Sequence, residues 1–120
     1  MARRILAVDD NAQFLAMLTE FLTAQGYEVV TAPDAGNAFM LVAVATPDVV
    51  LLDIGMPDVD GVTALRRIRA RHPRLPVIVC SANVDVARDA LKRAAFGYVT
   101  KPVDFDHLAR VVEAAIAQSA

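Results

Sequence analysis

Short apolar runs along the chain alternate with longer segments in which apolar residues recur at helical spacing. Residues 5–8 form the first run, and Phe14, Leu18 and Leu22 follow it at intervals of four residues. Strands that alternate with amphipathic helices are typical of a parallel sheet wrapped by helices. Strands are expected at residues 5–8, 27–31, 49–52, 77–80 and 98–99, and helices are expected to begin near residues 11, 34, 61, 84 and 104.

These elements predict an α/β fold: a doubly wound sheet of five parallel strands with five helices, in a single domain that spans residues 1–120. Residues 49–52 are all apolar, as expected of a central strand that helices cover on both faces. Right-handed crossovers bring the carboxyl ends of such strands to one edge of the sheet, and ligands bind outside that edge. Functional side chains are therefore expected where the strands end.

Composition and charge narrow the possible functions. The chain has a net charge of −2 and a single cysteine, Cys80, which cannot form an internal disulfide and which fits a reducing, cytoplasmic environment. No stretch approaches the ~20 apolar residues that a membrane span requires, so membrane insertion is not expected. The net charge gives no electrostatic case for direct nucleic-acid binding. The one basic stretch is interpreted as a solvated helix face and comprises Arg66, Arg67, Arg69, Arg71 and Arg74.

Chemically versatile side chains lie at the predicted strand ends. Asp9 and Asp10 follow the first strand, Asp53 the third, Ser81 the fourth and Lys101 the fifth. Carboxylates that converge in one crevice repel each other, and a hard divalent cation such as Mg²⁺, or Mn²⁺, relieves that repulsion. A carboxylate can also attack phosphorus to form an aspartyl phosphate, while a metal and an ammonium group stabilise the transferring oxygens. The pattern predicts a Mg²⁺-assisted phosphoryl transfer at this edge of the sheet.

Four stretches, in this order and each at a strand end, resemble the receiver domains of two-component response regulators. They are residues 8–11 (Val-Asp-Asp-Asn), 51–61 (around Asp53), 80–82 (Cys-Ser-Ala) and 97–102 (Gly-Tyr-Val-Thr-Lys-Pro). The resemblance implies a flavodoxin-like fold with strand order 2-1-3-4-5. It also implies a phosphorylation-dependent signalling switch, not a turnover enzyme. A histidine kinase or a histidine phosphotransfer protein would be the donor, and the surface of the fourth helix, fifth strand and fifth helix would respond.

The resemblance implies a role for each acidic residue of the site and for two neighbours. Asp53 is the expected phosphoacceptor. Asp10 and Asp53 are expected to bind Mg²⁺ directly, together with the backbone carbonyl of Gly55, while Asp9 acts through metal-bound water. The positions of Gly55 and Asn83 are expected to set the lifetime of the phosphorylated state, because Gly55 blocks no water and Asn83 can orient one.

The remaining implied roles concern residues of the fourth and fifth strands and the residues that follow them. Lys101 is expected to contact the phosphoryl group, or Asp53 when that residue is unphosphorylated. A cis peptide bond is expected between Lys101 and Pro102, since bonds to proline tolerate this form. Ser81 would be the switch hydroxyl and Tyr98 the switch aromatic.

Simpler roles remain open for several of these residues. Asp9 could cap the helix that begins near Asn11, Ser81 could be an ordinary loop hydroxyl, and Lys101 could be a solvated lysine. Tyr98 could be a plain core residue. The residues interpreted without a chemical role are His72 and His107 as surface residues, Asp58 as a loop residue, Asp60 as the cap of the third helix, and Cys80 as a buried, inert thiol.

Three features depart from the receiver pattern. Ala94 stands where receivers usually carry glycine, so the sequence does not decide the conformation of the turn after the fourth helix. Phe96 replaces a polar residue. If the fifth strand reaches back to Phe96, this side chain lies on the same side of the strand as Tyr98 and offers an anchor for a partner or a homodimer. Residues 35–47 carry no charge, and Met40 and Val44 fall where receivers expose polar side chains. This indicates either a binding face or side chains that fold over the rim of the domain.

Three other functions were weighed against the signalling switch. An aspartyl-phosphate phosphatase of the haloacid dehalogenase type requires Asp-X-Asp on one strand, and Asp53-Ile54-Gly55 lacks the second acid. A flavodoxin-like cofactor binder requires a glycine- and hydroxyl-rich phosphate loop, for which Asp9-Asp10-Asn11 is unsuited. A degenerate receiver that serves only as an interaction module would not need an intact acidic set.

Overall fold

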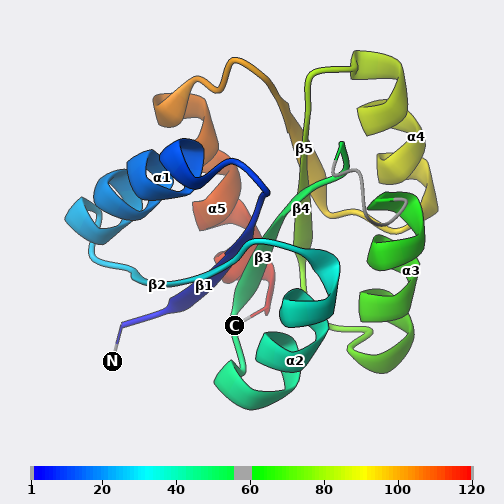
Figure 1. Ribbon diagram of the computed structural model, residues 1–120, viewed down its shortest axis with the longest axis horizontal. Coiled ribbons are helices and arrows are strands. Elements are labelled where there is room, and N and C mark those ends of the chain that lie inside the picture. Colours follow the sequence, from blue (N-terminus) through cyan, green and yellow to red (C-terminus); the bar gives the residue numbers. More distant parts are fainter. Residues whose placement is uncertain (1, 56–60, 120) are drawn as a thin grey trace.

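The computed structural model describes residues 2–55 and 61–119, and strands and helices alternate throughout this part of the chain (Figure 1). The strands are β1 (Arg4–Val8), β2 (Glu28–Ala32), β3 (Val49–Asp53), β4 (Val77–Ser81) and β5 (Gly97–Thr100). The helices are α1 (Ala12–Ala24), α2 (Ala35–Ala45), α3 (Gly61–Arg71), α4 (Val84–Arg93) and α5 (Phe105–Ser119). Each predicted element is present. The interpretations of Asp58 and Asp60 lie outside the described residues.

The strands form one parallel sheet in the order β2-β1-β3-β4-β5, which confirms the predicted fold class. The element ends differ from prediction by one or two residues. β2 begins at Glu28 because the Tyr27 N–H still donates to the Leu22 carbonyl, after Gly26 has turned the chain with a φ of 95°. α4 ends before Ala94 because the chain closes there on the carbonyl of Ala90.

Helices cover both faces of the sheet, α1 and α5 on one and α2, α3 and α4 on the other (Figure 1). β3 contributes alternately to the two cores: Val49 and Leu51 pack toward α1 and α5, and Val50 and Leu52 pack toward α2 and α3. Both faces of β3 are therefore buried, which explains its unbroken apolar sequence.

Polar residues that follow the strands start three of the helices. The side-chain oxygen of Asn11 accepts from the Phe14 N–H at 3.1 Å and so caps α1. Asp34 caps α2 in the same way, and Asn83 caps α4. Each cap satisfies backbone N–H groups at a helix start and contributes about 1 kcal/mol. Because Asn11 is the N-cap of α1, the interpretation of Asp9 as that cap is wrong.

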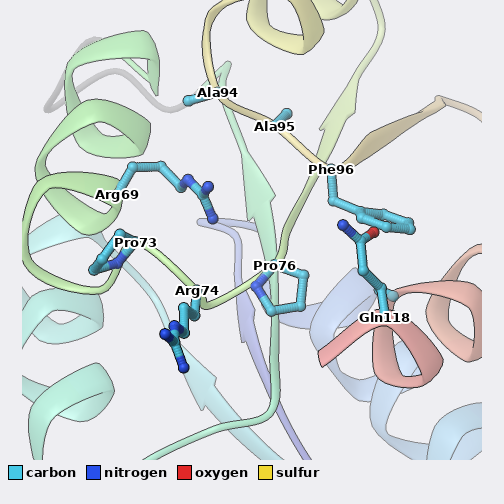
Figure 2. Close-up of a pocket in the computed structure, with 9 residues that line it drawn as sticks. Arg69, Pro73, Arg74, Pro76, Ala94, Ala95, Phe96 and Gln118 are labelled. Carbon is cyan, nitrogen blue, oxygen red and sulfur yellow. The ribbon is translucent and has the colours of Figure 1, made fainter. Parts of the chain in front are cut away.

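The α4–β5 connection shows how the chain turns at Ala94 and where Phe96 lies relative to Tyr98. Ala94 forms the turn with a φ of −171°, an extended value that does not require glycine. Phe96 and Tyr98 would share one side only if the strand reached back to Phe96, but β5 begins at Gly97. Phe96 packs with the α1–α5 core, beside Gln118 in Figure 2, whereas Tyr98 packs with the α2–α4 core. Both residues nevertheless line one hollow beside β5.

The uncharged helix α2 exposes two of its apolar side chains. Met40 is 54% exposed and Val44 is 75% exposed, so neither folds over the rim of the domain. Ala38 and Val42, by contrast, are buried against the sheet. α2 therefore presents apolar side chains to the core and to the solvent.

Candidate functional site

The sheet brings the predicted site residues to one edge. Val8 pairs with Leu52 in register, so Asp9 and Asp53 follow neighbouring positions of β1 and β3. Ser81 is the last residue of β4, and its carbonyl accepts from the Lys101 N–H at 2.8 Å. Parallel pairing alone therefore collects residues that are far apart in the sequence.

Three carboxylates form the centre of the site. Asp9, Asp10 and Asp53 each offer an oxygen, and these oxygens lie within 4.8 Å of one another. Asp9 and Asp53 are only 1% and 6% exposed, while Asp10 is open to solvent. Oxygen ligands of this kind, with room for water on one side, suit Mg²⁺. The donor set therefore fits the cation that the sequence predicts.

Lys101 supplies the positive charge of the site. Its Nζ lies 2.8 Å from Asp9 Oδ2 and 3.5 Å from Asp53 Oδ2. The resemblance implied a contact with Asp53; that ion pair is present, but Asp9 is the nearer partner. Burial lowers the pKa of the Lys101 ammonium, but the hydrogen bond to Asp9 and the charge of Asp53 outweigh burial, so the pKa is raised overall. Lys101 is therefore charged and is not a solvated surface lysine.

Asp53 sits in an environment that disfavours its charge. Burial raises the pKa of this carboxyl group, and the charge of Asp9 raises it further. The Gly55 N–H, which donates to Asp53 Oδ1 at 2.9 Å, and the Lys101 ammonium act in the opposite direction but do not cancel the rise. A cation beside these carboxylates would stabilise the ionised form of Asp53.

Asp9 is held by the chain itself. Its Oδ1 accepts from the Asn11 N–H at 2.9 Å, and its Oδ2 accepts from Lys101. Both oxygens of Asp9 therefore have a partner within the chain. The Asp10 carboxylate, at the solvent side, is the more accessible of this pair.

Ser81 and Asn83 form a turn beside the acidic cluster. Ser81 is buried, and its Oγ accepts from the Asn83 N–H at 3.0 Å. The side-chain oxygen of Asn83 accepts from the backbone N–H groups of Asp85 and Val86. Asn83 is thus primarily a helix cap, and only its amide nitrogen is left to orient water. Tyr98 is half-buried beside β4, one strand from Ser81.

The other residues singled out in the sequence lie away from the chemistry or do not react. The Lys101–Pro102 bond is cis, as expected. Cys80 is buried, as expected, and burial raises the pKa of its thiol to about 12, which disfavours the reactive thiolate. His107 is exposed and His72 is half-buried.

Sequence reasoning missed the part that Phe14 takes in the site. The Lys101 ammonium lies 4.7 Å from the centre of the Phe14 ring, within the range of a cation–π contact. The available signal was the position of Phe14, which lies in the first turn of a helix that starts directly after Asp9 and Asp10. Because α1 begins at Ala12, directly after its cap Asn11, its first turn brings the Phe14 ring beside the Lys101 ammonium.

A second hollow lies at the opposite ends of the strands, as Figure 2 shows. It includes Pro76, just before β4, and Phe96, just before β5, together with Arg69 and Arg74. None of the residues that line it belongs to the acidic cluster. The candidate site is therefore the carboxyl edge, as the sheet topology requires.

Comparison with known proteins agrees with this geometry. Residues 5–113 match the response regulator receiver domain family. This chain is a response regulator receiver domain. The receiver domain is 43% identical over 115 residues to the regulatory protein AtoC of Escherichia coli, covering 94% of this chain and 25% of that protein. It is 38% identical to the DNA-binding transcriptional regulator NtrC of Salmonella typhimurium, covering 93% of this chain and 24% of that protein.

Solved structures give the same result. The receiver domain superposes on NtrX of Brucella abortus with a TM-score of 0.92 and 35% identity, covering 99% of this chain and 28% of that one. A response regulator receiver domain protein of Clostridium thermocellum gives a TM-score of 0.91 and 31% identity, with coverage of 97% and 95%. The chain spans about a quarter of the length of the curated relatives it matches. Across the described residues, no helix has the length and apolar character needed to cross a bilayer.

The family assignment separates the alternative functions. The match to the receiver family favours the signalling switch over a phosphatase of the haloacid dehalogenase type and over a flavodoxin-like cofactor binder. The acidic set is intact, and the fold assembles it at one edge. This receiver domain belongs to two-component response regulators, whose receivers act as phosphorylation-dependent switches.

Proposed function

We propose that this receiver domain accepts a phosphoryl group on Asp53 from a phosphohistidine and that the modification changes its surface for a partner. The observation that carries the proposal is the convergence of Asp9, Asp10 and Asp53 around one point, with the Lys101 ammonium on the inner side. Of the three, Asp53 is the last residue of the central strand β3, and like Asp9 it lies beside the Lys101 ammonium.

The proposed reaction is a nucleophilic displacement at phosphorus. One carboxylate oxygen of Asp53 forms a bond to phosphorus while the phosphorus–nitrogen bond to the donor imidazole breaks, and the imidazole leaves with that electron pair and takes a proton from solvent. The Gly55 N–H orients the carboxylate through Oδ1. The Lys101 ammonium, already 3.5 Å from Oδ2, stabilises charge on the transferred oxygens.

Asp10 and Asp53, with the carbonyl of Gly55, would hold Mg²⁺, and Asp9 would hold its water. Bound Mg²⁺ supplies positive charge that offsets the carboxylates and the phosphoryl oxygens. The raised pKa of Asp53 supports this assignment, because burial and the charge of Asp9 leave the carboxyl group short of positive charge. The chain orients the site, and the cation balances its charge.

The proposed switch begins at Ser81. Its hydroxyl gives up the Asn83 N–H and donates to a phosphoryl oxygen, since phosphorylation introduces strong acceptors beside it. Tyr98, half-buried on the neighbouring strand, then turns into the space beside β4. Such a packing change has two discrete states and alters the surface of α4, β5 and α5. The hollow that Phe96 and Tyr98 line at the β5 edge is where a partner, an output domain or a second copy would sense it.

The proposed donor is a histidine kinase or a histidine phosphotransfer protein in the cytoplasm. The site is a switch and not a centre for turnover of an external substrate, and we propose no contact of the receiver domain itself with nucleic acid. The opening above Asp10 supports access by a donor histidine, because this is the exposed side of the acidic cluster.

The test is incubation with acetyl phosphate or phosphoramidate, followed by intact-mass measurement. The wild-type protein with Mg²⁺ should gain the mass of one phosphoryl group, and Asp53→Asn should gain none. Asp48→Asn is the matched control, since the Asp48 carboxylate accepts from the Arg4 backbone N–H at the opposite ends of the strands from the site. A gain that persists in Asp53→Asn, or that a chelator leaves unchanged, would overturn the proposal.

A further inference from the structure

The uncharged helix α2 and the arginine-rich helix α3, which have no part in the proposed phosphorylation, lie on one face of the domain. α2 carries no charge and exposes Met40 and Val44, and α3 carries a run of arginines. In the structure these helices lie next to each other on the same face of the sheet (Figure 1). The uncharged helix and the basic helix thus form one continuous surface.

A groove of about 360 Å³ runs between the two helices. Its floor is apolar and includes Val42 and Ile68, which are buried, and Phe39, which is half-buried. Met40 lies three residues before Ala43, a groove residue, and therefore on the same side of the helix. The apolar surface continues from the groove over the exposed crest of α2.

Arginines form the other wall of this groove. Arg67 and Arg71 both line it and, four residues apart, lie on one stripe of α3. The Arg67 guanidinium is 5.7 Å from the centre of the Phe39 ring, so this cation is held over the apolar floor. Among the described residues, no carboxylate forms an ion pair with Arg67 or Arg71. The groove is apolar at its floor and positively charged along one rim.

We propose that the α2–α3 groove binds an amphipathic helix of a partner protein whose polar flank is acidic. The apolar face of such a helix would cover Phe39, Ala43 and Met40, in the helix-in-groove mode of peptide recognition. Carboxylates along its flank would pair with Arg67 and Arg71, whose fork of N–H donors matches carboxylate geometry. Charge complementarity selects this partner, because a basic helix would be repelled by the two guanidinium groups and a neutral helix would gain no ion pair with them.

This surface is separate from the switch surface. The groove lies between the C-terminal halves of α2 and α3, whereas the proposed phosphorylation site lies at the carboxyl ends of the strands. Its occupancy therefore does not depend on Asp53, and binding is expected without phosphodonor or metal. A failure of phosphorylation and a failure of groove binding can thus be told apart.

The test uses a synthetic helical peptide of about 18 residues with leucines on one face and glutamates on the flank, and a second peptide with lysines in place of the glutamates. Each is titrated into the ¹⁵N-labelled, unphosphorylated chain and followed by NMR. The glutamate peptide should cause saturable shifts at amides of α2 and α3, and its affinity should fall at high salt. The lysine peptide should cause none.

Variants separate the groove from general surface effects. Met40→Glu, and separately Arg67→Glu with Arg71→Glu, should each weaken the glutamate peptide about tenfold. Met17→Glu and Arg110→Glu, on the helices of the opposite face, should not change its affinity. Equal binding of both peptides, shifts centred elsewhere, or equal losses in the control variants would overturn the proposal. So would concentration-dependent self-association that Met40→Glu abolishes, because a second copy would then cover the groove.

Discussion

Replacement of Lys101 by methionine should strongly destabilise the metal-free receiver domain. The Lys101 side chain is 26% exposed, and its Nζ lies 2.8 Å from a buried Asp9 oxygen and 3.5 Å from an Asp53 oxygen. Methionine keeps most of the apolar stem, but it removes the charge and with it the cation–π contact with Phe14. Three neighbouring carboxylates would then face each other with no described cation among them.

The expected size of the effect follows from these distances. At an effective dielectric constant of about 20, charges 2.8 Å apart attract each other by about 6 kcal/mol. The desolvation of the lysine opposes this attraction, and removal of one partner of a buried pair typically costs about 3–5 kcal/mol. Because Lys101 is partly exposed, we expect the lower end, a loss of about 3 kcal/mol and of about 10 °C in Tm.

Urea unfolding in the presence of a chelator measures this loss. Lys92→Met, at an exposed position of α4, removes the same charge and serves as the control. The double variant Lys101→Met with Asp9→Asn should lose less than the two single losses added together, because one of the repelling charges is gone. Mg²⁺ should stabilise Lys101→Met more than the wild type, since the cluster there lacks its own cation. If Lys101→Met were no less stable than Lys92→Met, the ammonium would not be what holds the carboxylates together.

Three further predictions concern single residues of the site. Asp53→Asn should stabilise the metal-free protein near neutral pH, because burial and the charge of Asp9 raise the pKa of Asp53. The gain in stability should disappear as the pH falls through that pKa and Asp53 becomes protonated. A gain that thermal unfolding shows to be the same from pH 4 to pH 8 would contradict this. Gly55→Arg should lengthen the lifetime of the phosphorylated state, because the arginine side chain can exclude water from the acyl phosphate. The site has room for it, since a Cβ at position 55 would lie 3.4 Å from Asp53 Oδ1 without a backbone clash. Equal or faster loss of phosphate, measured by intact mass, would refute the prediction. Cys80 should resist iodoacetamide at pH 8 in the folded protein and react only in denaturant, because the thiol is buried and its pKa is about 12; rapid alkylation of the native chain would show that the α5 face opens.

Much of the fold could be predicted from local signals. The unbroken apolar run of β3 indicated a strand covered on both faces, and the helical spacing of Phe14, Leu18 and Leu22 indicated α1. The convergence of Asp9, Asp53 and Lys101 followed from topology alone, because parallel strands end at one edge of the sheet. These features depend on periodicity and connectivity, which the sequence carries directly.

The details that could not be predicted depend on side chains from different elements. Lys101 lies nearer to Asp9 than to Asp53, and this is decided by the path of the chain after β5 and by the position of Phe14 on α1. Whether the fifth strand reaches back to Phe96 could not be told from the sequence; β5 starts at Gly97, and Phe96 packs in the opposite core from Tyr98. The meeting of α2 and α3 in one groove likewise required their tertiary arrangement.

The central claim is that Asp53 is the residue that accepts the phosphoryl group. Treatment of the protein with phosphoramidate and Mg²⁺, followed by borohydride, converts an aspartyl phosphate to homoserine, which peptide mass spectrometry can locate. The account predicts homoserine at position 53 and at no other aspartate, with none formed when Mg²⁺ is omitted. Homoserine at Asp9 or Asp10, or an unmodified Asp53 in a protein that has gained phosphate, would contradict it.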